Sequence, residues 1–211
     1  MPFADRQNAG IVAGALSLSE DIHTADVTGS QRAGLSALIA GVEKAKAGAA
    51  KNVLVASGDR RKARAGSTQE FQMGHGAAAF LLGVDHVAAR FLGSHSISVD
   101  FVDHFRGESE EFDYGWEERW IRDEGFTKIV PRAVKGLLEK TGVAASAVDH
   151  FILPCLFAKL DQQIAAKCGI DAAKVRDNLA GNVGECGAAH ALLMLAHVLE
   201  ALVLSQGDRP R

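Results

Sequence analysis

Cysteine, excess positive charge and long apolar runs are all lacking in this sequence, and each shortage excludes a class of protein. Three Cys among 211 residues is a small and odd count, which excludes a disulfide scaffold and predicts reduced thiols in a cytoplasmic protein. No apolar run reaches the ~20 residues that a membrane span needs. The first seven residues lack the basic-then-apolar order of a signal peptide. We therefore expect neither a membrane protein nor a secreted one.

The charge balance argues against a nucleic-acid partner. The chain has 23 Lys+Arg against 26 Asp+Glu, a net charge of −3, and a pI of about 6.2, whereas nucleic-acid binders usually carry a basic footprint. What the sequence does have is an ordinary hydrophobic content of 47% and as many as 22 Gly. This composition predicts a globular chain of one domain or two small ones, with close backbone packing.

Apolar runs alternate with helical patterns along the chain. The periodicity predicts strands at 21–28, 52–57, 76–83 and 148–153, and helices at 5–18, from 30 to Gly48, and at 123–141, 157–168 and 187–204. Residues 87–105 are expected to be extended, and the acidic, aromatic segment 107–118 to be irregular. Strands that alternate with helices favour an α/β fold with a largely parallel sheet.

Three segments together resemble the thiolase superfamily of acyl-CoA condensing enzymes. Residues 25–38, ADVTGSQRAGLSAL, resemble the strand, turn and helix that present the nucleophile. Residues 52–83, with NVLVASGDRR and QEFQMGHGAAAFLLG, resemble two paired strands of that family. Residues 148–200 resemble its histidine and asparagine segments, in VDHFILPCLFAKL and LAGNVGECGAAHALLMLAHVLE. The nearest branch is that of hydroxymethylglutaryl-CoA synthase and 3-oxoacyl-acyl-carrier-protein synthase III.

The resemblance implies an α/β fold of thiolase-like layered helices and mixed sheets. It divides the chain into a first half, 1–86, with the nucleophile-helix region, and an incomplete second half, 87–211. Outer strands are expected to be lacking at both ends. In the family, strands and helices precede the first segment of this chain, and a carboxylate base of the synthase branch that they carry falls at or before Met1. The last seven residues resemble the turn that leads into the family's last two strands. Uncovered sheet edges need a covering partner.

The same resemblance implies the chemistry. We expect an acyltransferase that forms or cleaves a carbon–carbon bond between acyl thioesters by a Claisen-type reaction. Coenzyme A thioesters would be substrates, with no bound cofactor and no metal. A homodimer or hetero-oligomer is expected, because thiolase-fold enzymes are typically dimers.

The nucleophile position departs from the family, because no Cys lies near the start of the helix after residue 30. Ser30 occupies that position, or Gln31 does with a shift of one residue. Ser30 is either a hydroxyl nucleophile or a helix N-cap. Gln31 at this position resembles decarboxylating ketosynthase variants that carry Gln for Cys, which implies that an acyl thioester is held without an acyl-enzyme.

Two further candidates come from the histidine and asparagine segments. Cys155 stands where the family has its His, and is either a thiol nucleophile or oxyanion contact, or a small buried residue. The asparagine of the histidine segment is replaced by Ala158. Asn182 matches the family's carbonyl or oxyanion donor, and its alternative role is a turn residue beside glycines. The predicted catalytic residues are therefore Ser30, Cys155 and Asn182.

Other chemistry-bearing residues have weaker patterns. Cys186 and His190 lie four apart and suggest a metal pair, but a third ligand is missing. Glu185 is either a base or an acid at the start of a helix. The basic stretch 60–64 would contact a coenzyme A phosphate, or would form a solvated loop.

Two alternatives stay open. The missing Cys, His and base fit a non-catalytic thiolase-fold subunit or pseudoenzyme that pairs with an active partner. A nucleotide-binding α/β fold would need a glycine-rich phosphate loop after the first strand, and residues 29–34 lack its middle glycine.

Overall fold

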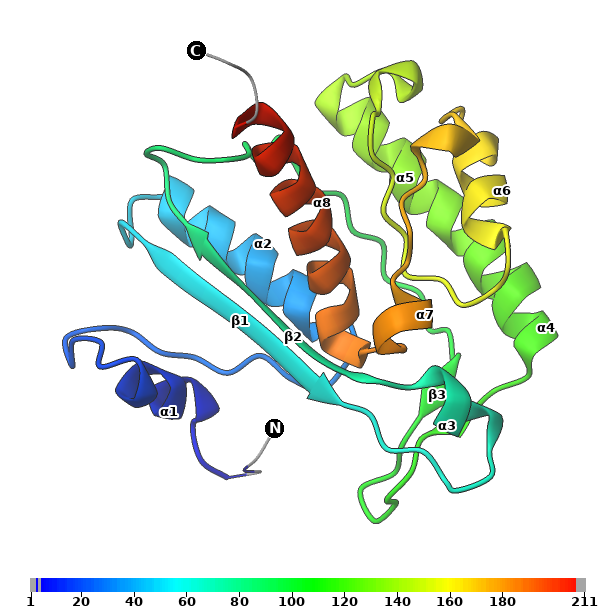
Figure 1. The fold of residues 1–211 in the computed structure, drawn as a ribbon, viewed down its shortest axis with the longest axis horizontal. Coiled ribbons are helices and arrows are strands. Elements are labelled where there is room, and N and C mark those ends of the chain that lie inside the picture. Colours follow the sequence, from blue (N-terminus) through cyan, green and yellow to red (C-terminus); the bar gives the residue numbers. More distant parts are fainter. Residues whose placement is uncertain (1–2, 4, 208–211) are drawn as a thin grey trace.

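The computed structural model describes residue 3 and residues 5–207. Figure 1 shows its elements, which are two short sheets and a series of helices. The helices are α1 (Asn8–Ala15), α2 (Ala33–Lys46), α3 (Thr68–Gln72), α4 (Glu118–Trp120), α5 (Thr127–Thr141), α6 (Leu160–Lys167), α7 (Ala180–Val183) and α8 (His190–Gly207). The strands are β1 (Val53–Arg60), β2 (His75–Leu82), β3 (His104–Phe105) and β4 (Tyr114–Gly115).

The first sheet is a hairpin of β1 and β2, and its inner face carries both long apolar helices. The strands run antiparallel, from Val53 opposite Leu82 to Arg60 opposite His75. The prediction of a largely parallel sheet is therefore wrong for this pair. The connection through α3 reverses the chain direction, whereas a parallel pair needs a crossover. α2 and α8 both pack on the face that holds Val55 and Gly76 (Figure 1).

A second apolar cluster lies in the later part of the chain, among α5, α6 and the segment before α6. Its buried members are Phe151, Cys155, Leu160, Ile164, Ala165, Cys168 and Ile170. Phe126 and Phe157 add an edge-to-face aromatic contact, with ring centroids 5.7 Å apart. The predicted helices of this region are present, with α6 shorter than expected.

Pro131 lies inside α5 and does not end it. Proline lacks an N–H, so the carbonyl of Thr127 four residues earlier loses its helical donor. The Lys167 ammonium supplies a replacement, since its Nζ lies 2.8 Å from the Thr127 oxygen. A π-helical turn, Ile121–Phe126, precedes α5 and joins it to α4.

Two of the four predicted strands form no ladder among the described residues. Residues 21–28 form no helix or strand, and residues 148–153 form one parallel bridge, Phe151 to Val175. Of the segment 87–105 that was predicted to be extended, residues 87–103 form no helix or strand, and the last two residues form β3. The predicted irregular excursion contains a short antiparallel pair, β3 with β4. The prediction of a strand at 21–28 is therefore wrong, and that at 148–153 is wrong apart from the single bridge at Phe151.

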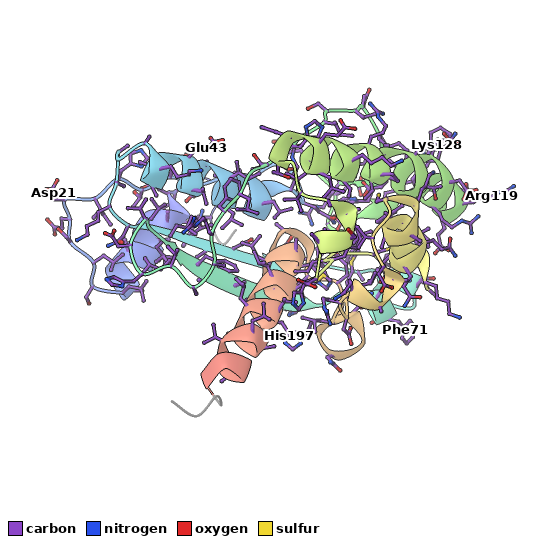
Figure 2. The ribbon with its side chains drawn as sticks, turned by 90° about the horizontal axis from the view of Figure 1, so that it is seen from above. Asp21, Glu43, Phe71, Arg119, Lys128 and His197 are labelled. Carbon is purple, nitrogen blue, oxygen red and sulfur yellow. The ribbon has the colours of Figure 1, made fainter. Side chains whose placement is uncertain are left out.

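α8 is apolar enough, by length and composition, to be a candidate membrane span over residues 187–204, and a third of that stretch is buried. Its first half is core, because Leu192, Met194 and Val198 are buried. Figure 2 shows the C-terminal half of α8, which carries His197, extending away from the other elements. This helix is therefore a core helix over its first half and is exposed toward its C-terminal end, where Val203 and Leu204 are 54% and 72% exposed.

Candidate active site

The start of α2 is the position where the sequence predicts a nucleophile. Ser30 is exposed, its hydroxyl makes no hydrogen bond with a described residue, and its carbonyl accepts from the Ala33 amide at 3.0 Å. The N-cap residue is Arg32, whose side chain does not cap the helix. Ser30 therefore does not cap α2, and its hydroxyl lies free beside the positive end of the helix dipole.

α2 approaches β1 and the turn before α8 very closely at Gly34. A Cβ at this position would collide with the carbonyl oxygen of Ala188 and lie 2.8 Å from the Ser57 hydroxyl. That hydroxyl itself donates to the Ala188 oxygen at 3.0 Å, and the Ala188 amide donates to Asp59 at 3.0 Å. A glycine is thus required where the two halves of the chain meet.

Arg61 is the centre of a buried ion-pair network beside this junction. Its guanidinium lies 2.6 Å from Asp113 and 2.5 Å from Glu185, and its side chain is 7% exposed. Glu185 also accepts from the Gly187 amide at 2.8 Å. Asp113 is held from its other side by Arg106 at 3.4 Å. Arg61 therefore ties the end of β1 to the β3–β4 segment and to the turn before α8.

Gln31 faces this network. In the amide orientation that satisfies its neighbours, its oxygen accepts from Arg61, with Nη2 at 3.1 Å, and from His104 Nε2 at 3.0 Å. His104 in turn contacts Asp103 through Nδ1 at 2.8 Å. Burial raises the pKa of the Asp103 carboxyl, but the hydrogen bond and charge of His104 outweigh it and leave that pKa below its ordinary value. Gln31 is thus fixed by two donors of the site.

Cys155 lies on a different part of the molecule's interior, in the second apolar cluster. Its side chain is 4% exposed, and its sulfur lies 3.8 Å from the Phe157 carbonyl oxygen. Burial raises the pKa of the Cys155 thiol to about 11. The thiolate that a nucleophile requires is therefore disfavoured.

Asn178 links the Cys155 segment to the base of α8. Its side-chain amide donates to the Cys155 backbone carbonyl oxygen at 2.7 Å. The backbone carbonyl oxygen of Asn178 accepts from His190 Nε2 at 2.7 Å. The Cys186 amide donates to His190 Nδ1 at 3.2 Å, so Nε2 carries the proton of this buried imidazole. Cys186 and His190 are thus neighbours, as their spacing predicts. No group of three or more His, Cys, Asp or Glu in the described ranges is arranged for a metal ion.

Asn182 lies in α7 and its side chain is exposed. The turn around it docks on the segment before β2, where the Gly74 amide donates to the Glu185 carbonyl oxygen at 2.9 Å. A Cβ on Gly74 would collide with the Val183 carbonyl oxygen. The glycines at this contact therefore allow the backbone before β2 and the backbone around α7 to approach closely.

The three predicted catalytic residues make no hydrogen bond with one another among the described residues. The polar cluster next to Ser30 consists instead of Gln31, Arg61, Asp113, Glu185 and His104. The sequence predicted only some of the residues in this polar cluster. Gln31 and Glu185 were candidates, and Arg61 lay in a stretch expected to be solvent or phosphate-facing. Asp113 and His104 enter through the β3–β4 pair, which residue patterns did not predict.

Comparison with known proteins reveals sequence relatives along nearly the whole chain. The hydroxymethylglutaryl-CoA synthase of Pyrococcus furiosus is 28% identical over 212 residues, which cover 99% of this chain and 59% of that protein. That of Aeropyrum pernix is 30% identical over 211 residues, covering 99% and 57%. The chain thus spans less than two thirds of the length of these relatives. No family model matches the chain.

Solved structures with the same fold include a β-ketoacyl-acyl-carrier-protein synthase III from Thermus thermophilus. Its TM-score is 0.79 at 15% identity, over 94% of this chain and 65% of that one. A variant of OleA from Xanthomonas campestris gives 0.78 at 22% identity, over 94% and 63%. The predicted thiolase-like α/β fold and the predicted resemblance are therefore confirmed. The chain is similar to hydroxymethylglutaryl-CoA synthases along nearly its whole length, and this similarity does not favour the alternative of a non-catalytic partner subunit.

Proposed function

We propose that this chain handles acyl-CoA thioesters as part of a Claisen-type condensing enzyme that forms or cleaves a carbon–carbon bond. The observation that carries the proposal is the match to hydroxymethylglutaryl-CoA synthases over 99% of the chain. Acyl-CoA is a substrate in this proposal, and no resident cofactor is required. The expectation of a cytoplasmic oligomer without nucleic-acid or membrane partners, divided near residue 86, belongs to the same proposal.

The geometry at the start of α2 supports binding of the thioester carbonyl there. Helix amide groups and the dipole favour negative charge at this end. Arg61 and His104 are hydrogen-bond donors in the same cluster. Such groups stabilise the oxyanion that develops when an acyl thioester is attacked or loses an electron pair. Asn182, as a further carbonyl donor, would have to turn toward the substrate from its exposed position.

Ser30 is the proposed acyl acceptor of the three candidates. Its hydroxyl is exposed, whereas Cys155 is buried and its raised pKa opposes thiolate formation. Acylation would transfer the acyl group from coenzyme A sulfur to the Ser30 oxygen, with the hydroxyl proton passing to the departing thiolate. Gln31 supports a second form of the same function, in which the thioester is held without an acyl-enzyme.

Intact-mass spectrometry after incubation with acetyl-CoA and longer acyl-CoAs tests the proposal. An adduct that maps to Ser30 and disappears in Ser30→Ala establishes the acyl-enzyme. Ser146→Ala, an exposed serine far along the chain, is the matched control and should keep the adduct. An adduct on Cys155 would move the nucleophile to that residue.

Acyl-CoA binding is measured in parallel by calorimetry on the same folded protein. Binding without any adduct identifies the non-acylating form, in which case Gln31→Ala should weaken binding and Ser30→Ala should not. A folded chain that neither binds nor reacts with any acyl-CoA overturns the proposal.

A further inference from the structure

The side-chain oxygen of Gln31 receives hydrogen bonds from two different parts of the chain. Arg61, just beyond β1, donates to it, and so does His104 Nε2, at the start of β3, from 3.0 Å. A guanidinium in a protein is always charged and can only donate. If the amide were turned over, its N–H groups would face those of Arg61. Arg61 therefore fixes the Gln31 oxygen on the inner side of the amide.

The nitrogen of the same amide points away from these donors. It makes no hydrogen bond with a described residue. The buried side-chain atoms that lack a partner in the described part of the chain belong to other residues, so the Gln31 nitrogen is accessible. Gln31 follows the exposed Ser30, at the start of α2 where an acyl thioester is proposed to bind. Its two N–H groups are thus available to a carbonyl oxygen of a ligand.

The contacts of His104 define its protonation state. Its Nδ1 lies 2.8 Å from the Asp103 carboxyl group. Burial raises the pKa of that carboxyl, but the hydrogen bond and charge of His104 bring the pKa below its ordinary value, so the group is ionised and can only accept. The Gln31 oxygen can also only accept. Both ring nitrogens must therefore donate, which makes His104 an imidazolium.

A neutral His104 has one N–H and cannot keep both contacts. The charged Asp103 is the stronger acceptor, so Nδ1 keeps the proton and the Nε2 lone pair faces the Gln31 oxygen. Arg61 prevents the amide from turning over to offer its nitrogen. β4 brings only Gly115 opposite His104. The other charged groups of the cluster are paired among themselves, and they are Arg61, Arg106, Asp113 and Glu185.

We infer that His104, in its imidazolium form, is a positioning residue of the proposed site. Together with Arg61 it holds Gln31 so that the Gln31 amide nitrogen donates to the carbonyl oxygen of a bound acyl thioester. The inference rests on the proposed function and adds its regulation, because thioester binding through Gln31 weakens when His104 loses its proton. Imidazole changes its charge between about pH 5 and 8, so the site is strongest in the acidic part of this range.

Nuclear magnetic resonance of the 211-residue chain without ligand tests the positioning step. At about pH 5.5 both ring nitrogens of His104 should show the imidazolium pattern. As the pH is raised, the side-chain amide signals of Gln31 should shift with the same midpoint as those of His104. In His104→Gln the Gln31 signals should stay constant, because the new amide nitrogen lies as many bonds from the backbone as Nε2 and donates at every pH. Gln31 signals that ignore His104 overturn the inference, whether or not acyl-CoA binds.

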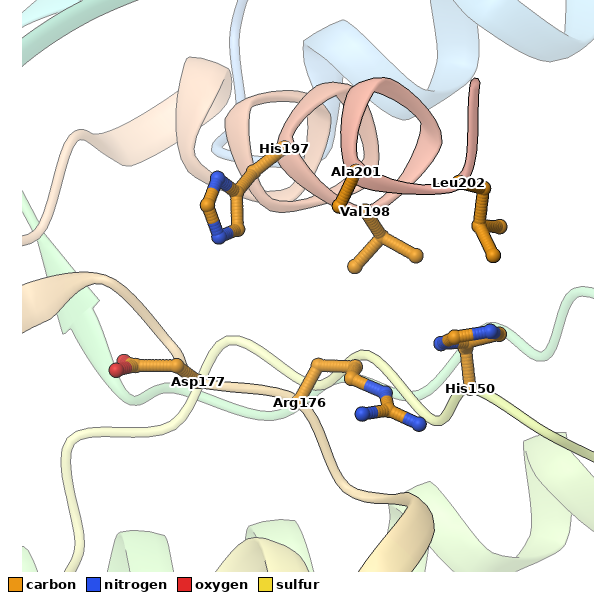
Figure 3. A pocket seen from close by; sticks show the side chains of 7 residues that line it. All are labelled: His150, Arg176, Asp177, His197, Val198, Ala201 and Leu202. Atoms are coloured by element: carbon orange, nitrogen blue, oxygen red, sulfur yellow. The ribbon is translucent and has the colours of Figure 1, made fainter. Parts of the chain in front are cut away.

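Calorimetry with acetyl-CoA tests the binding step, and His197→Gln is the control. His197 lies on α8 and faces Asp177 across a cavity of about 330 Å³ that no residue of the Gln31 cluster lines (Figure 3). Phosphate monoesters titrate near about pH 6, so each variant is compared with this control at the same pH.

The two substitutions of His104 should have opposite pH dependences. At about pH 6, His104→Leu should bind acetyl-CoA about tenfold more weakly than the control, because a donor to Gln31 is lost. At about pH 8.5 the two should bind equally, since the control has lost the same donor. His104→Gln should match the control at the lower pH and bind about tenfold more tightly at the higher one.

Gln31→Glu separates holding the side chain from donating to the ligand. Its carboxylate still accepts from Arg61 and His104, so the thermal unfolding midpoint should be at least that of the wild type. It has no N–H group to offer, so its affinity for acetyl-CoA should fall at least about tenfold at every pH.

The results distinguish this inference from the proposed function. Equal binding by His104→Leu and the control at every pH, or wild-type binding by Gln31→Glu, overturns the inference and leaves the proposed function intact. Coupled shifts of Gln31 and His104 in a chain that binds no acyl-CoA overturn the proposed function and, with it, the thioester as the ligand of Gln31.

Discussion

At the scale of the residue, Arg61 joins three separate parts of the chain. It lies just beyond β1, and its two carboxylate partners come from the β3–β4 segment and from the turn before α8. Removal of one partner from a buried ion pair leaves an uncompensated charge, which costs more than the pair itself contributes. Arg61 should therefore be more important for stability than any surface arginine of this protein.

Arg61→Met tests this. It keeps most of the apolar stem but leaves Asp113 and Glu185 without their cation, and we expect the free energy of unfolding to fall by about 3–5 kcal/mol. Arg60→Met, at the neighbouring exposed position, should change it by less than about 0.5 kcal/mol. Urea denaturation measures both. Equal effects of the two substitutions would show that the network contributes nothing specific.

Cys155 offers a prediction on pH. Burial raises the pKa of its thiol to about 11, against an ordinary value of about 9. At pH 8 the thiolate fraction is then about 100-fold lower than in the unfolded chain, so alkylation by iodoacetamide should be slower by at least that factor. The labelling rate should keep rising up to about pH 11, and a midpoint near pH 9 would contradict the burial argument. Because the folded state holds this proton more tightly, the group's stabilising contribution is complete below pH 9 and is lost between 9 and 11.

At the scale of the element, local patterns located the helices better than the strands. The apolar spacing placed α2, α5 and α8 within a few residues, because a helix satisfies its own backbone. A strand needs a neighbour, which no local pattern can reveal, so residues 21–28 and 148–153 have strand-like sequences without forming ladders. The proline of α5 was read as an interruption, because the compensating Lys167 is distant in sequence.

The contact between Lys167 and Thr127 can be isolated by a double-mutant cycle. Lys167→Met should cost about 1 kcal/mol, because it removes the donor to the carbonyl that Pro131 leaves without a helical partner. In a Pro131→Ala background, the alanine amide can donate to Thr127, and the effect of Lys167→Met should shrink toward zero. Thermal and urea unfolding of the four proteins measure the coupling. Additive effects would show that Lys167 does not replace the helical donor.

At the scale of the whole molecule, the order of three motifs predicted the thiolase-like fold correctly, although no single motif was specific. The candidate site was predicted less completely. Ser30 and Gln31 were located at the start of α2, but the residues that surround them come from segments whose pairing only tertiary structure reveals. His104 and Asp113 reach Gln31 and Arg61 because β3 and β4 pair with each other. The sequence also could not predict the area of exposed surface, because that area depends on which helices and strands pack against one another.

That exposed surface predicts a low denaturant dependence of unfolding. An unfolded chain of 22.3 kDa exposes about 32,300 Å², so folding to 14,126 Å² buries about 18,200 Å². A compact protein of this mass would bury about 22,900 Å². Since the urea m-value is proportional to the area exposed on unfolding, the m-value of this chain should be about four fifths of that of a compact protein of equal length. A compact m-value would show that the chain closes over the exposed C-terminal part of α8 in solution.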